Sequence, residues 1–316
     1  MNDKKSEEYV VIFGKKYPIH DNKLDLSDVY CSLSEVEGLS DHDNLEVLIL
    51  QNNNIHKIEN LENLTNLRIL SFGWNNITEI SGLDTLINLE VLRFGDHRNS
   101  SNRITKIKGL NNLNNLKELW LPGNNVREIS GLAALEKLEL LFLSENHISE
   151  IEGLENLHNL KELYLDSNNI NELKGLEKLK NLEMLYLDDN NITNLKGLGN
   201  LTQLKHLGLN SNNVQEIKYL NNLINLEFLH LDNNNISEIR GLEALHNLER
   251  LDLRNNKITS IKGLNTLESL NELNLKGNSI DKIPSMIILK ELGFDGTEDW
   301  IEKRFIKRSR QCEYRE

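Results

Sequence analysis

Four aromatic residues stand 22 positions apart in the middle of the chain: Trp120, Phe142, Tyr164 and Tyr186. Only 5% of all residues are aromatic, so this regular series is informative. Aromatic side chains offer a large, rigid contact area and are frequent anchors of protein–protein interfaces. Rings on neighbouring strands also stabilise each other as cross-strand pairs. We predict that the series contacts a protein partner, with pairing between strands alongside.

Acidic side chains follow the aromatic series at the same interval. Asp166 and Asp188 stand two positions after Tyr164 and Tyr186, and further carboxylates follow toward the C-terminus. Carboxylates beside rings favour a partner with basic and apolar groups, which they steer by charge. The predicted partner-binding residues are Trp120, Phe142, Tyr164, Tyr186, Phe228, His230, Asp166, Asp188, Asp232 and Asp252.

His206, His230, Asp232 and Asp252 also have side chains that bind metals, and neighbouring strands would bring them near one another. Solvated polar groups on an open sheet are the favoured interpretation. The chain has no phosphate-binding loop, no zinc-protease motif, no nucleophile elbow and no paired CxxC. An open repeat surface also lacks the enclosed pocket that catalysis needs. We therefore predict no metal, no cofactor, no catalytic residues and no enzymatic activity.

These residues belong to a repeat of 22 residues with the pattern L-x-x-L-x-L-x-x-N-x-I-x-x-I-x-G-L-x-x-L-x-x. Eleven repeats begin at Leu45, Leu67, Leu89, Leu116, Leu138, Leu160, Leu182, Leu204, Leu226, Leu248 and Leu270. We number places within a repeat from this first leucine. The third repeat carries five extra residues within 95–102, which form either a contact loop or a neutral length variant.

Each place in the repeat has a physical role. Leucines at places four and six alternate with other residues, as in a short strand with one buried face. Places three, five and seven then point outward. The Asn at place nine can satisfy buried turn groups of its own and adjacent coils, and Cys31 takes this place in a degenerate repeat ahead of the array. The Gly at place 16 predicts a positive φ, so Tyr219 at that place is expected to distort its coil.

One coil cannot bury its own aliphatic residues, whereas stacked coils can, and the two ends need caps. We predict three segments: a hairpin cap turning at Gly14 with the degenerate repeat (1–44), the eleven repeats (45–288), and a last strand with a helical cap (289–316). The fold class is α/β: a right-handed solenoid, or horseshoe, with a parallel concave sheet and short 3-10 or irregular convex segments. The basic tail from residue 300 is either that cap helix or a second docking element.

The repeat pattern resembles the 22-residue class of leucine-rich repeat proteins. This class includes the regulatory subunit of type 1 protein phosphatase and the bacterial internalins, and the resemblance covers about residues 24–294. It implies partner binding on the concave face, with Trp120, Phe142, Tyr164, Tyr186, Asp166, Asp188, Asp232 and Asp252 matching the phosphatase subunit in residue type and column. Three functions stay open: a general scaffold, a phosphatase or GTPase regulator, and an internalin-like surface adhesin.

Composition indicates which kinds of ligand and which cellular compartment to expect. The formal charge of −13 disfavours binding to nucleic acid phosphates. The chain has no long apolar stretch and its start lacks the apolar region of an export signal, so we expect a cytoplasmic protein with no membrane span. Two cysteines form no disulfide framework. A monomer is the expected state, and self-association through the concave face is the alternative.

Overall fold

The computed structural model describes residues 8–96 and 102–280, and it divides into two compact units, residues 1–169 and 170–316. Strands β3 to β14 are parallel and follow one another in chain order. The N-terminal unit contains β3 (Lys23–Asp25), β4 (Val47–Ile49), β5 (Ile69–Ser71), β6 (Val91–Arg93), β7 (Glu118–Trp120), β8 (Leu140–Phe142) and β9 (Glu162–Tyr164). The C-terminal unit contains β10 (Met184–Tyr186), β11 (His206–Gly208), β12 (Phe228–His230), β13 (Arg250–Asp252) and β14 (Glu272–Asn274).

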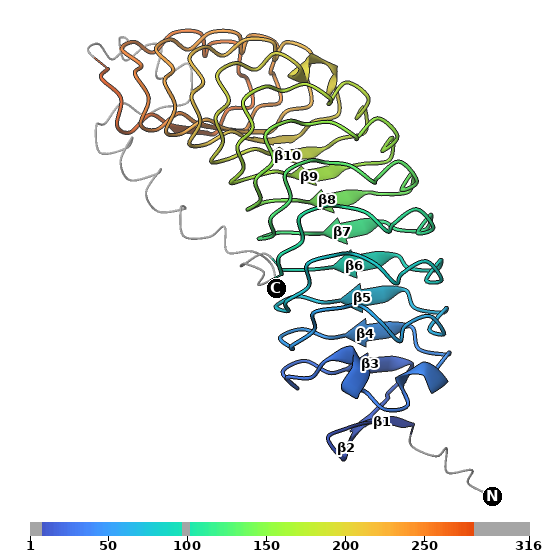
Figure 1. Cartoon of the computed structure of the whole chain (residues 1–316). Coiled ribbons are helices and arrows are strands. Elements are labelled where there is room, and N and C mark those ends of the chain that lie inside the picture. The colour runs from blue at the N-terminus through green and yellow to red at the C-terminus, as the bar shows by residue number, and fades with distance from the viewer. Residues whose placement is uncertain (1–7, 97–101, 281–316) are drawn as a thin grey trace, which may run out of the picture. The chain divides into compact units, whose positions relative to one another are not determined.

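Each repeat forms one coil of a solenoid, which confirms the predicted fold class. Figure 1 shows strands β3 to β9 stacked one upon the next, with the chain returning through turns between them. Regular helix is confined, within the described ranges, to the 3-10 segments η1 (Leu33–Glu35), η2 (Leu39–Asp41) and η3 (Leu198–Asn200). The five-residue insertion leaves the strand register intact, because Val91 pairs with Glu118 and Arg93 with Trp120 across it.

The core lies between the strands and the returning turns. Leucines at places four and six, such as Leu163 and Leu165, are fully buried, and most strands show a buried central residue between two half-buried ones. Phe72 and Phe94 replace leucine at place six and stack with ring centroids 5.6 Å apart. The alternation places residues three and five of every repeat on the outward face of the sheet.

A buried asparagine column links successive coils, as the sequence predicts. Asn168 accepts a hydrogen bond from the backbone N–H of Ile148 in the preceding coil and donates to the carbonyl oxygen of Leu143 there. Cys31, predicted for place nine, instead takes place 11 of its coil, because Leu24 pairs with Leu48 at place four. Its backbone N–H donates to Asn53 Oδ1 at 3.2 Å, as that of Ile55 does to Asn75, and its thiol is buried. Burial raises the pKa of that thiol.

The glycine column at place 16 adopts the predicted positive φ, from 69° at Gly131 to 113° at Gly197. Tyr219 keeps this conformation with φ 68°. The departure lies in the coil before it, where Gly197 has the most extreme φ of the column and η3 follows.

An antiparallel hairpin precedes the sheet, formed by β1 (Tyr9–Ile12) and β2 (Lys15–Pro18) around Gly14 with φ 75°. Val10 and Ile12 from β1 are fully buried, and Val11 exchanges backbone hydrogen bonds with Glu37. The boundaries predicted for the three segments stay predictions. The last strand, the helical cap and the basic tail, as well as most of the 95–102 insertion, fall outside the described residues.

Candidate functional site: the outward face of the sheet

The outward face of the N-terminal unit carries a row of stacked rings at place five. Trp120 and Phe142 have centroids 4.9 Å apart with planes inclined by 9°, and Phe142 and Tyr164 have centroids 4.7 Å apart. The guanidinium of Arg93 lies 4.8 Å from the centroid of Trp120 and extends the row by a cation–π contact. We call Arg93, Trp120, Phe142 and Tyr164 the aromatic row.

Glutamates at place three anchor both ends of the aromatic row. Glu118 Oε2 accepts hydrogen bonds from Trp120 Nε1 at 3.0 Å and from Arg93 Nη2 at 2.9 Å. The hydroxyl of Tyr164 donates to Glu162 Oε2 at 2.9 Å. The indole N–H of Trp120 and the hydroxyl of Tyr164 are thereby held, which favours one orientation of these rings before any partner binds.

Stacking covers most of the area of the central rings. Trp120 and Phe142 are each only 7% exposed, although they lie outside the leucine core. Tyr164 at the end of the row is half-buried, as are Val91 and Leu140 at place three. Of the two roles predicted for these aromatics, pairing between strands accounts for Trp120 and Phe142. The area available for contact with a partner lies mainly on the residues around them.

The outward face of the C-terminal unit has a different arrangement. His206 stacks on Phe228 with centroids 4.5 Å apart, and the guanidinium of Arg250 lies 5.8 Å from the Phe228 centroid. Arg250 also forms an ion pair with Glu272 at 2.7 Å. At place five, Gly208 is buried, and a Cβ there would lie 2.8 Å from Tyr186 Cδ1 and 2.7 Å from Asp188 Oδ2. The missing side chain of Gly208 thus makes room for Tyr186.

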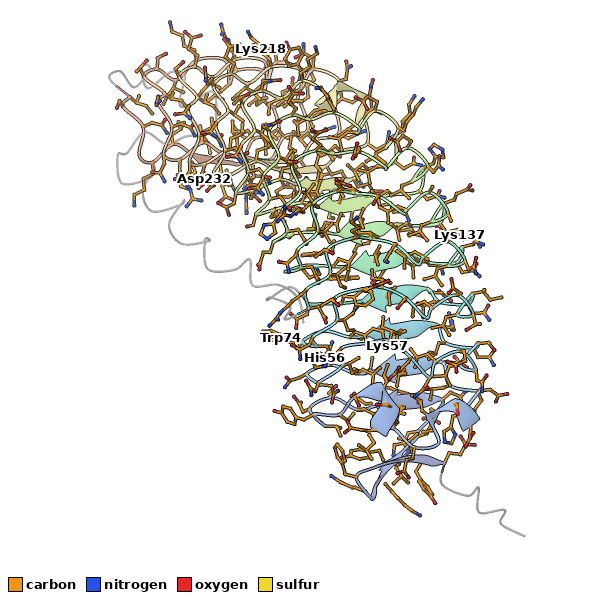
Figure 2. The ribbon with its side chains drawn as sticks, in the orientation of Figure 1. His56, Lys57, Trp74, Lys137, Lys218 and Asp232 are labelled. Carbon is orange, nitrogen blue, oxygen red and sulfur yellow. The ribbon has the colours of Figure 1, made fainter. Side chains whose placement is uncertain are left out.

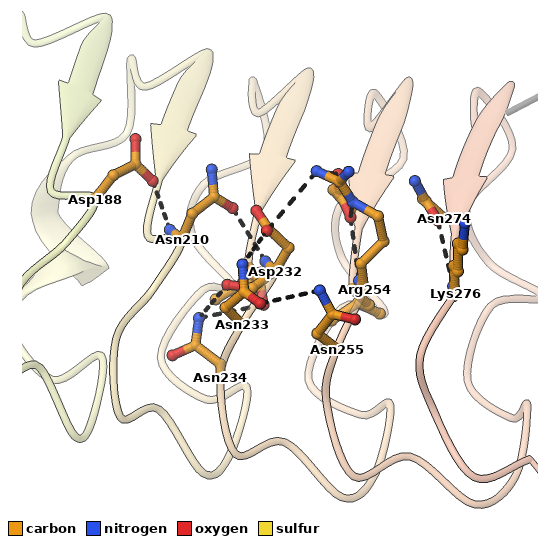
Figure 3. Close-up of polar contacts among 12 residues, drawn as sticks. Asp188, Asn210, Asp232, Asn233, Asn234, Arg254, Asn255, Asn274 and Lys276 are labelled. Atoms are coloured by element: carbon orange, nitrogen blue, oxygen red, sulfur yellow. Dashed lines mark hydrogen bonds and ion pairs between the residues drawn. The ribbon is translucent and has the colours of Figure 1, made fainter. Parts of the chain in front are cut away.

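The predicted aspartates of this unit act mainly as internal acceptors (Figure 3). Asp188 Oδ1 accepts the backbone N–H of Asn210 at 2.5 Å, and Asn210 Oδ1 accepts that of Asp232 at 3.0 Å. Arg254 pairs with Asp252 at 2.9 Å and with Asp232 at 3.7 Å. Asp166 of the N-terminal unit similarly accepts from Ser144 Oγ at 2.8 Å. Arg254 offsets the charge of Asp232 and Asp252, while the hydrogen bonds of Asp188 and Asp166 occupy acceptor positions that a partner would otherwise use.

Burial shifts two titrating groups at this face. It lowers the pKa of His230, against a smaller opposing effect of the Asp252 carboxylate. It raises the pKa of Asp232, and the neighbouring Asp252 adds to that rise while Arg254 counteracts it. Both groups therefore favour their neutral forms more than they would in water.

The structure brings Trp120, Phe142, Tyr164 and Asp166 together in the N-terminal unit. It brings Tyr186, Asp188, Phe228, His230, Asp232 and Asp252 onto the face of the C-terminal unit. In the described ranges no three His, Cys, Asp or Glu side chains are placed to hold a metal ion. No helix within those ranges is long and apolar enough to span a membrane.

The sequence analysis did not identify two further columns of residues that recur from coil to coil. The residue at place eight has a positive φ in the described coils from Asn52 to Asn255 except at Asp96, although most of these residues are not glycine. A second asparagine column at place 22 donates to the preceding coil, as Asn66 does to the carbonyl oxygen of Asp43. Recurrent Asn, Asp, Ser and Gly at place eight and recurrent Asn at place 22 were visible signals for both.

The comparisons with known proteins agree with this architecture. The model of the family described as Leucine Rich repeats (2 copies) matches residues 43–85, 136–178, 202–245, 224–266 and 246–287. These matches cover more than half of the chain, which therefore belongs to the leucine-rich repeat family. The search of curated proteins gives no match.

Solved structures of bacterial leucine-rich repeat proteins are similar to this chain. An internalin from Listeria monocytogenes is 28% identical with a TM-score of 0.63, over 80% of this chain and 86% of its own. A leucine-rich repeat protein from Leptospira interrogans is 29% identical with a TM-score of 0.67, over 81% of this chain and 72% of its own. A second Listeria internalin, internalin C2, is 34% identical with a TM-score of 0.51, over 55% of this chain and 77% of its own.

Proposed function

We propose that this chain is a non-enzymatic protein-binding module that contacts its partner with the outward face of its sheet. The observation that carries the proposal is the aromatic row of the N-terminal unit, with rings held in register by stacking and by Glu118 and Glu162. A pre-ordered surface loses little side-chain entropy on binding. Family membership supports an interaction role.

The contact surface consists of the aromatic row together with the half-buried residues of place three. Val91, Leu140 and Tyr164 supply apolar area that is accessible to a partner. The central rings act mainly as a rigid support for these residues. In the C-terminal unit the aspartates steer a basic partner only weakly, because Arg254 offsets Asp232 and Asp252.

The test compares two substitutions of aliphatic residues that are four positions apart. Val91→Asp places a charge on the outward face, whereas Ile87→Asp changes a side chain that is 52% exposed in the turn before that strand. The purified chain is cross-linked to proteins of the source lysate, and captured partners are quantified by mass spectrometry. We expect Val91→Asp to reduce capture of the main partner at least tenfold and Ile87→Asp to leave it unchanged.

Circular dichroism has to show first that both variants keep the fold. Equal capture by the wild type and Val91→Asp would reject the outward face as the binding surface. Light scattering across a concentration series tests the proposed monomer, since a mass that rises with concentration would favour self-association.

A second candidate, an internalin-like surface adhesin, is supported by the similarity to Listeria internalins. We propose the cytoplasmic setting instead, because the acidic chain carries few cysteines and no apolar stretch of membrane-spanning length. Antibody labelling of source cells separates the two: labelling only after permeabilisation supports the cytoplasm, and labelling of intact cells supports the adhesin. Regulation of a phosphatase or GTPase stays a hypothesis.

A further inference from the structure

A pocket of about 440 Å³ lies in the N-terminal unit, beside the turns that follow strands β3 to β6. It is lined by Ser27, Asp28, Gln51, Asn52, Trp74 and Asp96, which come from four successive coils. Figure 2 places Trp74 at the edge of the coils, on the side where the strands end. The pocket is therefore separate from the residues that form the aromatic row.

Trp74 is an unusual occupant of its backbone position. It stands at place eight with φ 59°, where other coils with a positive φ have Asn52, Gly123, Glu145 and Ser167. A bulky aromatic residue in the left-handed region is strained, whereas Asn and Gly tolerate it. Trp74 is also 38% exposed, so burial in the leucine core does not account for its presence. What distinguishes Trp74 from Tyr219, which has a similar φ, is that the indole lines a pocket.

The described residues around the indole include carboxylates. Trp74 Nε1 donates to Asp96 Oδ2 at 3.4 Å, which holds the ring beside that carboxylate. Asn52, another residue of the lining, donates to Asp28 Oδ1. Among the residues that the structure describes, the lining includes two carboxylates and no Lys or Arg. An aromatic face together with carboxylates provides the surroundings that a cationic side chain needs.

We propose that this pocket binds the guanidinium group of an arginine side chain of the partner protein. A guanidinium is planar, stacks on an indole and can donate to carboxylates at its edges, which an ammonium does less well. The net charge of −13 favours the approach of such a group. The inference rests on the proposed function only in taking the ligand from a protein, and it is tested without that partner.

The test follows the indole N–H of Trp74 by NMR in the ¹⁵N-labelled full chain, with its signal assigned by its loss in Trp74→Phe. The probe is N-acetyl-arginine N-methylamide, and the control is the matching citrulline compound, which has the same shape without the charge. We expect a saturable shift with the arginine probe at about millimolar affinity and none with citrulline. Asp28→Asn together with Asp96→Asn should weaken binding at least tenfold, while Asp84→Asn, a charge change elsewhere in the same unit, should not.

A missing shift with the arginine probe, an equal shift with citrulline, or an affinity unchanged by the double substitution would overturn the proposal. If the double variant does not fold, the comparison of the two probes on the wild type decides alone. Arg98 lies outside the described residues, so the titration is repeated in Arg98→Gln, and a shift seen only there would assign the pocket to the chain's own arginine.

The Val91→Asp variant separates this inference from the proposed function. It should lose the partner and still respond to the arginine probe. A response to the probe with unchanged partner capture would reject the sheet face and keep the pocket. No response together with lost capture would reject the pocket and keep the sheet face.

Discussion

The amide of Asn146 contacts only backbone groups, and all of them are buried with it. Its Oδ1 accepts the N–H of Val126 at 3.0 Å, and its Nδ2 lies 2.9 Å, 3.0 Å and 3.2 Å from the carbonyl oxygens of Leu121, Leu143 and Ser144. A side chain with both donor and acceptor is required, because the turns offer one N–H and several carbonyls at the same point.

Replacement of this amide should be costly. Asn146→Ala leaves the Val126 N–H and at least one carbonyl without a partner, and each such group costs about 1–3 kcal/mol. We expect the free energy of unfolding in urea to fall by about 3 kcal/mol. Asn54→Ala, which removes an exposed amide, serves as the control and should change it by less than about 0.5 kcal/mol. Equal effects of the two would contradict the role of the buried column.

His230 should make stability depend on pH. Burial lowers its folded-state pKa below its ordinary value near 6.5, so the unfolded chain takes up the proton first as pH falls. Stability is therefore complete above about pH 6.5 and declines as pH drops toward the folded-state pKa. The urea midpoint of the wild type should fall between about pH 7.5 and 5.5, and less so for His230→Gln. Parallel profiles for the two proteins would reject this assignment.

Asp232 acts in the opposite direction at lower pH. Its raised pKa means that the folded chain binds a proton more readily than the unfolded chain, so protonation of this carboxyl stabilises the fold as pH falls toward about 4. The comparison with His230→Gln separates the two groups, because Asp232 is present in both proteins.

At the scale of elements, the glycines at place 16 lie close to the backbone of the preceding coil. Gly109 has φ 71°, and a Cβ there would lie 2.7 Å from the carbonyl oxygen of Ile80 in the preceding coil. Gly109→Ala should lower the free energy of unfolding by about 2–3 kcal/mol, from strain and overlap together. Gly199→Ala is the matched control, because its Cβ would meet nothing closer than 3.7 Å. A neutral Gly109→Ala would show that the turn can move.

Tyr219 is the reverse case at the same place of the repeat. It holds φ 68° and is 53% exposed, so it is strained with little packing in return. Tyr219→Gly relieves strain of about 1 kcal/mol in the folded chain, and the greater flexibility of glycine in the unfolded chain offsets part of that gain. We expect a net rise in the free energy of unfolding. A thermal melt checks the direction. A clear loss of stability would mean that the tyrosine side chain contributes packing that outweighs its strain.

The repeat made most of these elements predictable. Leucines at places four and six, Asn at place nine and Gly at place 16 each have one physical role, so period and residue type together predict strand, ladder and turn. The exposure of Trp120 was not predictable, because it depends on how Phe142 and Arg93 stack against it. The pairing of Asp232 and Asp252 with Arg254 depends likewise on rotamers. The pocket at Trp74 combines residues from four coils, and no single repeat shows it.

For the whole molecule, stability should be a sum over neighbouring coils. Deletion of residues 204–225 removes one complete repeat, and the coil that begins at Leu226 then follows the coil that begins at Leu182 in the same register. We expect far-UV circular dichroism per residue to be unchanged and melting to stay cooperative. Deletion of 204–224 is the control, since it misplaces every later residue by one position. Loss of folding in both deletions would contradict independent coils.

The asparagine column has a direction. Asn53 accepts a hydrogen bond from the N–H of Cys31, Asn146 from that of Val126 and Asn278 from that of Ile258. Each amide therefore satisfies a backbone group of the coil that precedes its own in the chain. During synthesis on the ribosome the newest coil therefore waits for the next 22 residues before its turn is satisfied. Cys31 takes the place that Ile55 has in the next coil, and its N–H is the first in the sheet to be completed by this column. Folding during synthesis should therefore proceed from the N-terminus toward the C-terminus, because each coil obtains its last hydrogen bond from the coil that follows it.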